Sequence, residues 1–253
     1  MKASRLDPAF LARPFAHRGL HDKSRGVIEN SGTAIHAAVD AGYGIEIDIQ
    51  MSGDGVPIVF HDYDLKRLTG TAGFVREIGS DRLKNTKLVG GSDGIPALAD
   101  VLDIVDGQVP LLVEIKDQDM RLGPNVGPLQ KSVADLVTAY GGPVAVMSFN
   151  PCAMVDFAAY APHIPCGLVT EAFDQKAWPT VPRDRLKHLV DIPDASNADF
   201  VSHDRADLGS PAIRRLKGQG MPILCWTVRS AEEETAARQI ADQITFESFR
   251  PSQ

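Results

Sequence analysis

Two carboxylates and an imidazole stand within one short stretch that is typical of a strand, a tight turn and a returning strand. In residues 44–50, Glu46 and Asp48 alternate with isoleucines, so both acids share one face of the strand. Asp54-Gly55 then predicts a two-residue hairpin turn, because such turns need positive φ at their centre. With that turn, Asp48 lies directly opposite His61, and cross-strand partners share a face. The hairpin therefore predicts a cluster of Glu46, Asp48 and His61.

Such a cluster needs a positive partner. Two carboxylates 4 Å apart repel by roughly 4 kcal/mol at an effective dielectric near 20, and a bound divalent cation would offset that repulsion. Glu114 and Lys116 share a face of a further predicted strand at 110–116, so Glu114 completes a set of three acids with Glu46 and Asp48. Ligation by oxygen alone favours Mg²⁺ or Ca²⁺ over zinc.

The residues around this predicted metal site suit phosphoryl chemistry. Arg18 and Lys116 supply two fixed cations, which stabilise the charge that grows on a phosphate oxyanion in the transition state. His17 and His61 supply a general acid and a general base near neutral pH. Trp226 is expected to wall the site beside the organic part of a substrate.

Each of these residues also has an ordinary structural interpretation. Glu114 with Lys116 forms a buried ion pair in that view, His17 is a capping or surface group, and Trp226 belongs to the core. These separate interpretations do not predict that acids, imidazoles and cations converge at one place, which favours the functional hypothesis.

The elements that must position these residues alternate regularly along the chain. Leaving out the returning arm of the hairpin, eight strands alternate with helices, which predicts a (β/α)8 TIM barrel. The expected strands cover 14–18, 44–49, 110–116, 143–149, 166–170, 199–202, 221–228 and 243–246. A doubly wound open sheet is the rival, but it does not explain polar clusters after so many strands.

Residues 1–253 are expected to form a single domain with a small insertion at about 62–95, which is rich in Gly and Thr and weakly periodic. Three helix starts are predicted from capping signals: Asn30 or Ser31 for the first helix, Pro96 at the first helical position after the insertion, and Ser230 with Glu233 near the end. Residues 184–190 are a further candidate helix inside an ambiguous segment.

The composition limits the class of protein. The chain has 253 residues, of which 43% are hydrophobic and 23% charged, and a net charge of −7, so neither nucleic acid nor an anionic membrane is expected as the main partner. No apolar run approaches the roughly 20 residues of a membrane span, and the charged N-terminus is unlike a secretory signal. Three cysteines without CxxC spacing indicate reduced thiols in a cytoplasmic protein.

At these same residues the sequence resembles the glycerophosphodiester phosphodiesterase family. The matching motifs occur in family order and are His17-Arg18-Gly19, Glu29-Asn30-Ser31, Glu46-Ile47-Asp48, Val59-Phe60-His61-Asp62 and Glu114-Ile115-Lys116, with weaker support from Ser148-Phe149 and Trp226-Thr227-Val228. The resemblance implies a TIM barrel with a small insertion after the hairpin. It also implies Glu46, Asp48 and Glu114 as metal ligands, His17 and His61 as the acid–base pair, and Arg18 and Lys116 as phosphate contacts.

The implied reaction is the metal-dependent hydrolysis of a glycerophosphodiester, a small-molecule substrate, to an alcohol and sn-glycerol 3-phosphate. Two regions depart from the family pattern: residues 178–197, and the chain end at 244–249, which lacks the usual Thr-Asp motif. Two alternatives stand beside this hypothesis. One is a lysophospholipase D acting on lipid headgroups, with an apolar groove to which Phe173 and Trp178 contribute, and the other is a non-catalytic barrel that binds sugar phosphates.

Overall fold

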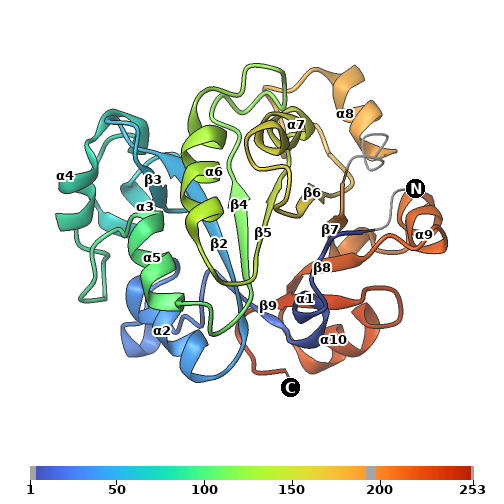
Figure 1. Ribbon diagram of the computed structural model, residues 1–253, viewed down its shortest axis with the longest axis horizontal. Helices are drawn as coiled ribbons and strands as arrows, with labels where there is room; N and C mark the ends of the chain where they lie inside the picture. Colours follow the sequence, from blue (N-terminus) through green and yellow to red (C-terminus); the bar gives the residue numbers. More distant parts are fainter. Residues whose placement is uncertain (1–3, 192–197, 252–253) are drawn as a thin grey trace.

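The computed structural model describes residues 4–191 and 198–251. Over these residues, eight parallel strands form a ring with helices on its outside, and one further strand, β3 (Pro57–Val59), pairs antiparallel with β2 (Figure 1). The parallel strands are β1 (Phe15–His17), β2 (Gly44–Met51), β4 (Leu111–Ile115), β5 (Val144–Ser148), β6 (Cys166–Thr170), β7 (Phe200–Asp204), β8 (Ile223–Val228) and β9 (Gln243–Phe246). Because β1 pairs with both β2 and β9, the ring closes. The predicted (β/α)8 barrel is confirmed, and the open sheet is excluded.

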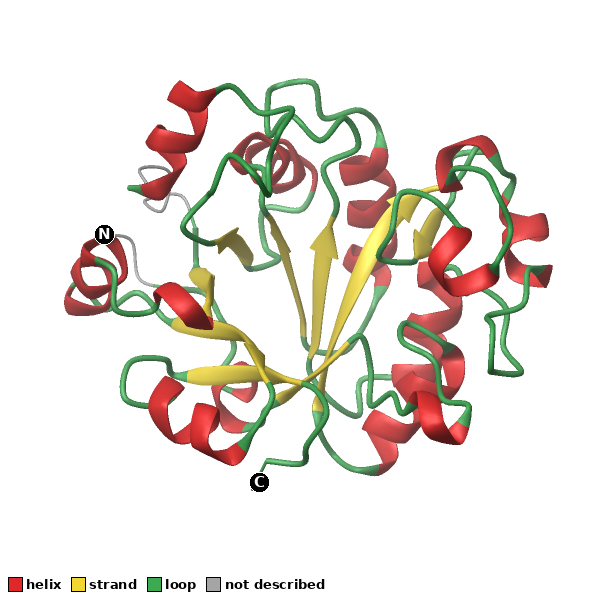
Figure 2. Ribbon diagram, turned by 180° about the vertical axis from the view of Figure 1, so that it is seen from behind, coloured by secondary structure: helices red, strands yellow, loops and turns green. Residues whose placement is uncertain are grey.

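Helices connect the strands and cover the outside of the barrel (Figure 2). They are α1 (Ala9–Ala12), α2 (Gly32–Asp40), α3 (Lys66–Thr69), α4 (Ser80–Asn85), α5 (Leu98–Val105), α6 (Leu129–Ala139), α7 (Pro151–Tyr160), α8 (Arg183–Val190), α9 (Pro211–Gly218) and α10 (Ala231–Ala237), with short 3-10 turns η1 (Lys23–Arg25), η2 (Val75–Glu77) and η4 (Arg205–Asp207). Ser31 and Ser230 cap α2 and α10 as predicted. In the part of the chain that is described, no helix combines the length and the apolar character needed to cross a bilayer.

The two faces of each strand have different environments, and this places the polar side chains. Ile45, Ile47 and Ile49 of β2 point outward into the apolar layer between barrel and helices. On the other face, Glu46 and Asp48 point into the barrel, where the strand register sets His17 beside Glu46 and Asp48 beside Glu114. Deeper in the barrel, apolar side chains such as Leu112 and Phe200 fill the interior. The acids therefore lie above a packed apolar plug, at the end of the barrel where active sites of this fold occur.

The hairpin after β2 differs from the prediction by one residue. Ile49 pairs with Val59, so Asp48 lies opposite Phe60 and not opposite His61. The loop has three residues, with Gly55 at φ +84°, because Ser52 Oγ accepts from Val56 N and Ser52 N donates to Val56 O. The predicted two-residue turn is wrong. His61 lies beyond the end of β3, and Gln50 Nε2 holds its carbonyl oxygen at 3.1 Å.

The insertion between β3 and α5 contains α3, η2 and α4, and lies at one side of the barrel (Figure 1). It packs on a separate apolar cluster made of Ile28, Ile58, Phe60, Leu65, Val75, Leu83, Leu88 and Ile95. The small insertion predicted after the hairpin is confirmed. Helix α5 begins at Leu98 and not at Pro96, because the Pro96 carbonyl still accepts from Val59 N at 2.9 Å and keeps the chain extended beside β3.

Candidate active site

A cavity of about 660 Å³ opens at the carboxyl ends of the barrel strands. Every residue expected to bind the metal or the phosphate, to transfer protons or to wall the site beside the substrate lines it: His17, Arg18, Glu46, Asp48, His61, Glu114, Lys116 and Trp226. These residues come from β1, β2, β4, β8 and the loop after β3, so the closed barrel brings together side chains that are far apart in the sequence. His61 reaches the cavity through its loop and not through the strand register that was predicted for it.

Glu46, Asp48 and Glu114 form a buried acidic cluster. One oxygen from each lies within 4.8 Å of the others, and all three side chains are almost fully buried. Lys116 Nζ lies between two of them, 2.6 Å from Asp48 Oδ1 and 2.5 Å from Glu114 Oε1. A single ammonium group therefore neutralises part of a site that contains three carboxylates.

The protonation of the cluster reflects this charge imbalance. Burial and the neighbouring Asp48 and Glu114 raise the pKa of Glu46 well above its ordinary value. Burial acts in the same direction on Asp48, but Lys116 and Arg18 outweigh it and hold the pKa of Asp48 well below its ordinary value. Burial alone would lower the pKa of Lys116, yet Asp48 and Glu114 raise it. Glu46 is thus the acid that most needs a further positive charge in order to ionise.

The donor set fits a divalent cation. Glu46, Asp48 and Glu114 offer only oxygens, which suits Mg²⁺ or Ca²⁺. The pKa of Glu46 is raised because burial, Asp48 and Glu114 outweigh Lys116 and Arg18, so the cluster needs further positive charge. A divalent cation among these oxygens would supply that charge.

Arg18 is fixed beside the cluster by an unusual backbone conformation and by ion pairs. Its φ of +58° turns its N–H toward Glu46, which accepts from it at 3.1 Å. Its guanidinium lies between Glu29, at 2.7 Å, and Asp48, at 3.3 Å. Asn30, which also has positive φ, donates to the same Oδ2 of Asp48 at 2.9 Å. The loop after β1 thus orients both Asp48 and one of the two cations predicted to bind phosphate.

His17 has a carboxylate partner from the other end of the chain. Its Nδ1 lies 2.8 Å from Glu247 Oε2, and Glu247 Oε1 accepts from Arg229 Nε at 2.7 Å. On the other side of the ring, Nε2 is 3.9 Å from Glu46 Oε2. Burial lowers the pKa of His17 although Glu247 opposes that shift, so the neutral, proton-accepting ring is favoured.

His61 has a similar partner, but a local one. Its Nδ1 lies 2.7 Å from Oδ1 of the next residue, Asp62, and Arg67 donates to both oxygens of Asp62. Arg67 also donates to both oxygens of Glu29, which in turn binds Arg18. A continuous chain of ion pairs therefore joins His61 to the cation beside the acidic cluster.

Sequence reasoning did not assign roles to the residues that hold the two histidines. Asp62 is the last residue of the matched motif Val59-Phe60-His61-Asp62, and Glu29 is the first residue of the matched motif Glu29-Asn30-Ser31. Glu247 and Arg229 follow β9 and β8 without any local pattern, and Glu247 lies in the segment that departs from the family motif. The sequence did contain one usable signal for Glu247. It directly follows the last barrel strand, and in a closed barrel that strand, β9, adjoins β1, which carries His17.

An aromatic wall forms the side of the cavity away from the insertion. Phe149 makes edge contacts with Trp226, at 5.6 Å between ring centroids, and packs on Trp178 at 5.2 Å. Trp226 Nε1 donates to the Ser202 carbonyl, which fixes the indole. Phe173 lies behind this wall in a buried cluster and does not line the cavity. The wall adds an apolar surface to a cavity whose other lining residues include the charged cluster.

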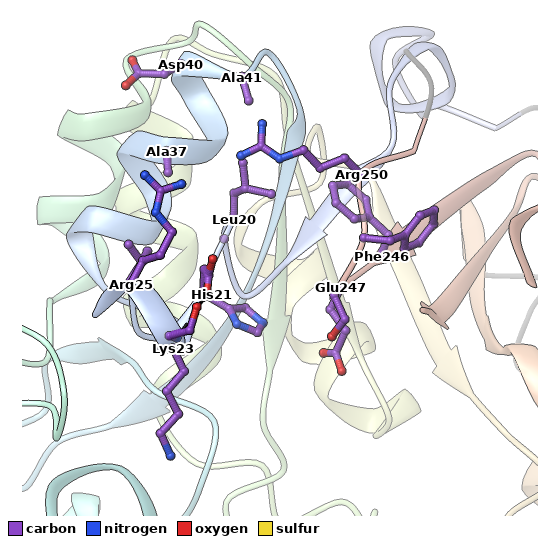
Figure 3. Close-up of a pocket in the computed structure, with 16 residues that line it drawn as sticks. Leu20, His21, Lys23, Arg25, Ala37, Asp40, Ala41, Phe246, Glu247 and Arg250 are labelled. Atoms are coloured by element: carbon purple, nitrogen blue, oxygen red, sulfur yellow. Dashed lines mark hydrogen bonds between the residues drawn. The ribbon is translucent and has the colours of Figure 1, made fainter. Parts of the chain in front are cut away.

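A second cavity, of about 850 Å³, lies between the loop after β1, α2 and the segment after β9 (Figure 3). Its sides carry Lys23, Arg25 and Arg250, and Phe246 forms part of its floor. Figure 3 shows Glu247 at one side of this cavity and Ala37 at the other. Glu247 thus borders the second cavity while its Oε2 contacts His17.

Comparison with known proteins places this geometry in context. The model of the glycerophosphoryl diester phosphodiesterase family matches residues 17–246. Over 175 residues the chain is 30% identical to the glycerophosphodiester phosphodiesterase of Caldanaerobacter subterraneus, covering 64% of this chain and 68% of that protein. It is 22% identical over 261 residues to human glycerophosphodiester phosphodiesterase 1, covering 91% and 76% of the two chains.

Solved structures share the architecture. A phosphodiesterase of Oleispira antarctica, in complex with the product sn-glycerol-3-phosphate, superposes with a TM-score of 0.73 at 23% identity and covers 94% of each chain. A glycerophosphodiester phosphodiesterase of Thermotoga maritima gives a TM-score of 0.67 at 21% identity, over 92% of each chain.

Proposed function

Because the chain belongs to the glycerophosphoryl diester phosphodiesterase family, we propose that it hydrolyses glycerophosphodiesters to an alcohol and sn-glycerol 3-phosphate, with His17 and His61 as the acid–base pair. The observation that carries this proposal is the convergence of three carboxylates, two histidines and two cations on one cavity. A barrel that only binds sugar phosphates would need the cations but not the two histidines held by carboxylates. The sn-glycerol 3-phosphate named with the Oleispira structure agrees with the proposed product.

Glu46, Asp48 and Glu114 would hold the divalent cation, Mg²⁺ or Ca²⁺. When bound, such an ion polarises phosphoryl oxygens and offsets the negative charge that grows on them. Arg18 and Lys116 lie beside the acidic cluster and are held in place by Glu29, Asp48 and Glu114. They would bind the remaining phosphate oxygens, because fixed cations in a buried site stabilise the transition state without reorganisation.

The two histidines would share the proton transfers. The first takes the proton of the attacking hydroxyl as its oxygen bonds to phosphorus. If the hydroxyl is that of water, sn-glycerol 3-phosphate forms directly; if it belongs to the substrate's own glycerol, a cyclic phosphate forms, which water then opens to sn-glycerol 3-phosphate. The other gives a proton to the alcohol oxygen as the phosphorus–oxygen bond breaks. His17 suits the first role, since burial favours its neutral ring, and His61, beside Asp62, suits the second.

The aromatic wall favours a second candidate for the leaving group. Phe149, Trp178 and Trp226 would contact an apolar alcohol, as in a lysophospholipase D reaction on lipid headgroup diesters. The two candidates share the phosphoryl chemistry and differ only in the substrate portion that leaves.

One experiment tests the reaction and the leaving group together. Wild-type protein, His17→Ala and His61→Ala are assayed for sn-glycerol 3-phosphate release from glycerophosphocholine, glycerophosphoethanolamine and a lysophospholipid, with Mg²⁺, with Ca²⁺ and with chelator. We expect turnover by wild type that the chelator abolishes, and near-complete loss in both variants. Release that persists in chelator, or in either variant, contradicts the proposed metal and histidine roles.

A further inference from the structure

We propose that Glu247 is the positioning residue for His17, and that Arg229 holds Glu247 in the position this requires. The inference rests on the proposed function, because it gives His17 a defined reacting nitrogen. It concerns a residue that touches neither the acidic cluster nor, by any contact in the described structure, the phosphate site. Its evidence is the geometry of His17, Glu247 and Arg229.

The contact between His17 and Glu247 determines which ring nitrogen faces the cavity. A carboxylate only accepts hydrogen bonds, so the 2.8 Å contact with Glu247 Oε2 places the hydrogen on His17 Nδ1. The lone pair of a neutral ring is then on Nε2, which points toward the cluster, 3.9 Å from Glu46 Oε2. Without Glu247 the ring is free to adopt either tautomer and to rotate about its side-chain bonds.

The position of Glu247 is itself fixed by its second oxygen and by its backbone. Oε1 accepts from Arg229 Nε at 2.7 Å, and the N–H of Glu247 donates to the Val228 carbonyl at 3.0 Å. Arg229 is fixed in turn, since its N–H donates to Glu233 at 2.7 Å at the start of α10. The carboxylate, with 19% of its side chain exposed, is thus held from both ends across the closure between β9 and β1.

The second cavity explains why Arg229 is needed. Glu247 borders this cavity on one side (Figure 3), and Arg229, which lines the active-site cavity together with His17, binds its second oxygen. A carboxylate with one side free gains from a second, fixed hydrogen-bond donor that keeps its other oxygen on the imidazole. Arg250 lines the same cavity but makes no contact with His17, Glu247 or Arg229 in the described residues, so Arg250→Ala is a matched control.

The experiment compares Glu247→Gln, Glu247→Asp, Arg229→Met and Arg250→Ala with wild type. We expect Glu247→Gln to lower kcat by about 10²-fold with KM changed less than threefold. A loss of this size lies between the losses that follow removal of the orienting partner of a metal-bound histidine and of a serine-protease histidine. Arg229→Met should lower kcat about tenfold, Glu247→Asp should recover part of the loss because it keeps an acceptor, and Arg250→Ala should resemble wild type.

A second measurement does not depend on turnover. In ¹⁵N-histidine NMR, with the His17 signal assigned by its loss in His17→Ala, wild type should show one tautomer with hydrogen on Nδ1, and Glu247→Gln a mixture. If wild type hydrolyses no diester, the proposed function fails while this spectrum still tests the positioning role. An unchanged tautomer in folded Glu247→Gln, or kcat within threefold of wild type, overturns the inference. If Glu247→Gln does not fold, the inference is overturned when both Glu247→Asp and Arg229→Met keep kcat within threefold of wild type.

Discussion

The two histidines of the cavity are held by the same kind of contact but by different parts of the molecule. Each has Nδ1 on a carboxylate that also binds an arginine, Glu247 with Arg229 for His17 and Asp62 with Arg67 for His61. His17 has 12% of its side chain exposed and His61 has 34%. The His17 unit bridges the closure of the barrel, whereas the His61 unit belongs to the insertion.

The two units also differ in what lies beyond the arginine. Arg229 is half exposed, and beyond it the His17 unit continues through Glu233, at the start of α10, to Arg205. Arg67 continues through Glu29 to Arg18, which contacts Asp48. The insertion is therefore coupled electrostatically to the predicted phosphate site. One histidine is therefore positioned by the closure of the barrel, and the other by an insertion that is linked to the predicted phosphate site.

The largest expected effect separates the chemical roles of the two histidines. His17→Ala and His61→Ala should each lower kcat on an alkyl glycerophosphodiester by about 10³-fold, within the usual range for a general acid or base. With a nitrophenyl leaving group, which departs without protonation, only His61→Ala should recover most of its activity. Steady-state kinetics on both substrates measure the difference. Recovery by His17→Ala instead would reverse the assigned roles and contradict the argument from burial.

A smaller effect tests the coupling through the insertion. Arg67→Met should lower kcat/KM about tenfold and raise KM, because it releases both Asp62 and Glu29 and so disturbs His61 and Arg18 together. By contrast, Arg229→Met should act on kcat alone. Lys84→Ala, in the same insertion, removes an exposed ion pair with Asp100 of α5; it is the control and should have wild-type kinetics. A change confined to kcat in Arg67→Met would show that the ion-pair chain does not reach the phosphate site.

How far the sequence predicts these two units depends on whether the interaction is local. Glu46, Asp48 and Glu114 were predictable because alternation along a strand fixes the face of each side chain, and strand order in a barrel then makes β2 and β4 neighbours. The hairpin register was not predictable from Asp54-Gly55, since the hydroxyl of Ser52 selects a three-residue loop. That single side chain moved the partner of Asp48 from His61 to Phe60.

The residues that hold the two histidines could not be predicted from the sequence for a different reason. Glu247 and His17 are 230 positions apart, and nothing in either segment marks the contact. Arg67 lies in the weakly periodic insertion, where pattern reasoning predicts only short elements. The barrel could be predicted because eight strand–helix repeats agree with one another, whereas each of these contacts depends on one side chain meeting another in three dimensions.

A substitution in the aromatic wall of Phe149, Trp178 and Trp226 should have a still smaller effect, and only on substrate binding. Trp178→Ala removes an indole that packs on Phe149 and lines the cavity. We expect KM for a lysophospholipid to rise about fivefold, as for the loss of one aromatic contact, with kcat and the KM for glycerophosphoethanolamine nearly unchanged. Val155→Ala, which shortens an exposed apolar side chain on α7, is the control. Equal increases in KM for both substrates would mean that the wall does not contact the leaving group.

The smallest expected effect is on the free energy of unfolding. It tests the ion pairs of Glu29 with Arg67 and Arg18, which connect the His61 unit to the predicted phosphate site. Burial would raise the pKa of Glu29, but Arg67 and Arg18 outweigh it and lower that pKa to about 2, from 4.5. A lowered carboxylate pKa stabilises the folded state above the unfolded value, and this contribution is lost as the pH falls toward 2. Between pH 6 and pH 3, wild type should therefore lose about 1 kcal/mol more unfolding free energy than Glu29→Gln, after allowance for solvent screening. Urea unfolding at both pH values measures this difference, with Asp135→Asn as the control because it breaks only an exposed pair on α6. If Glu29→Gln loses as much stability as wild type, the ion pairs from Arg67 to Arg18 do not hold in solution, and the two histidines are then supported to the same extent.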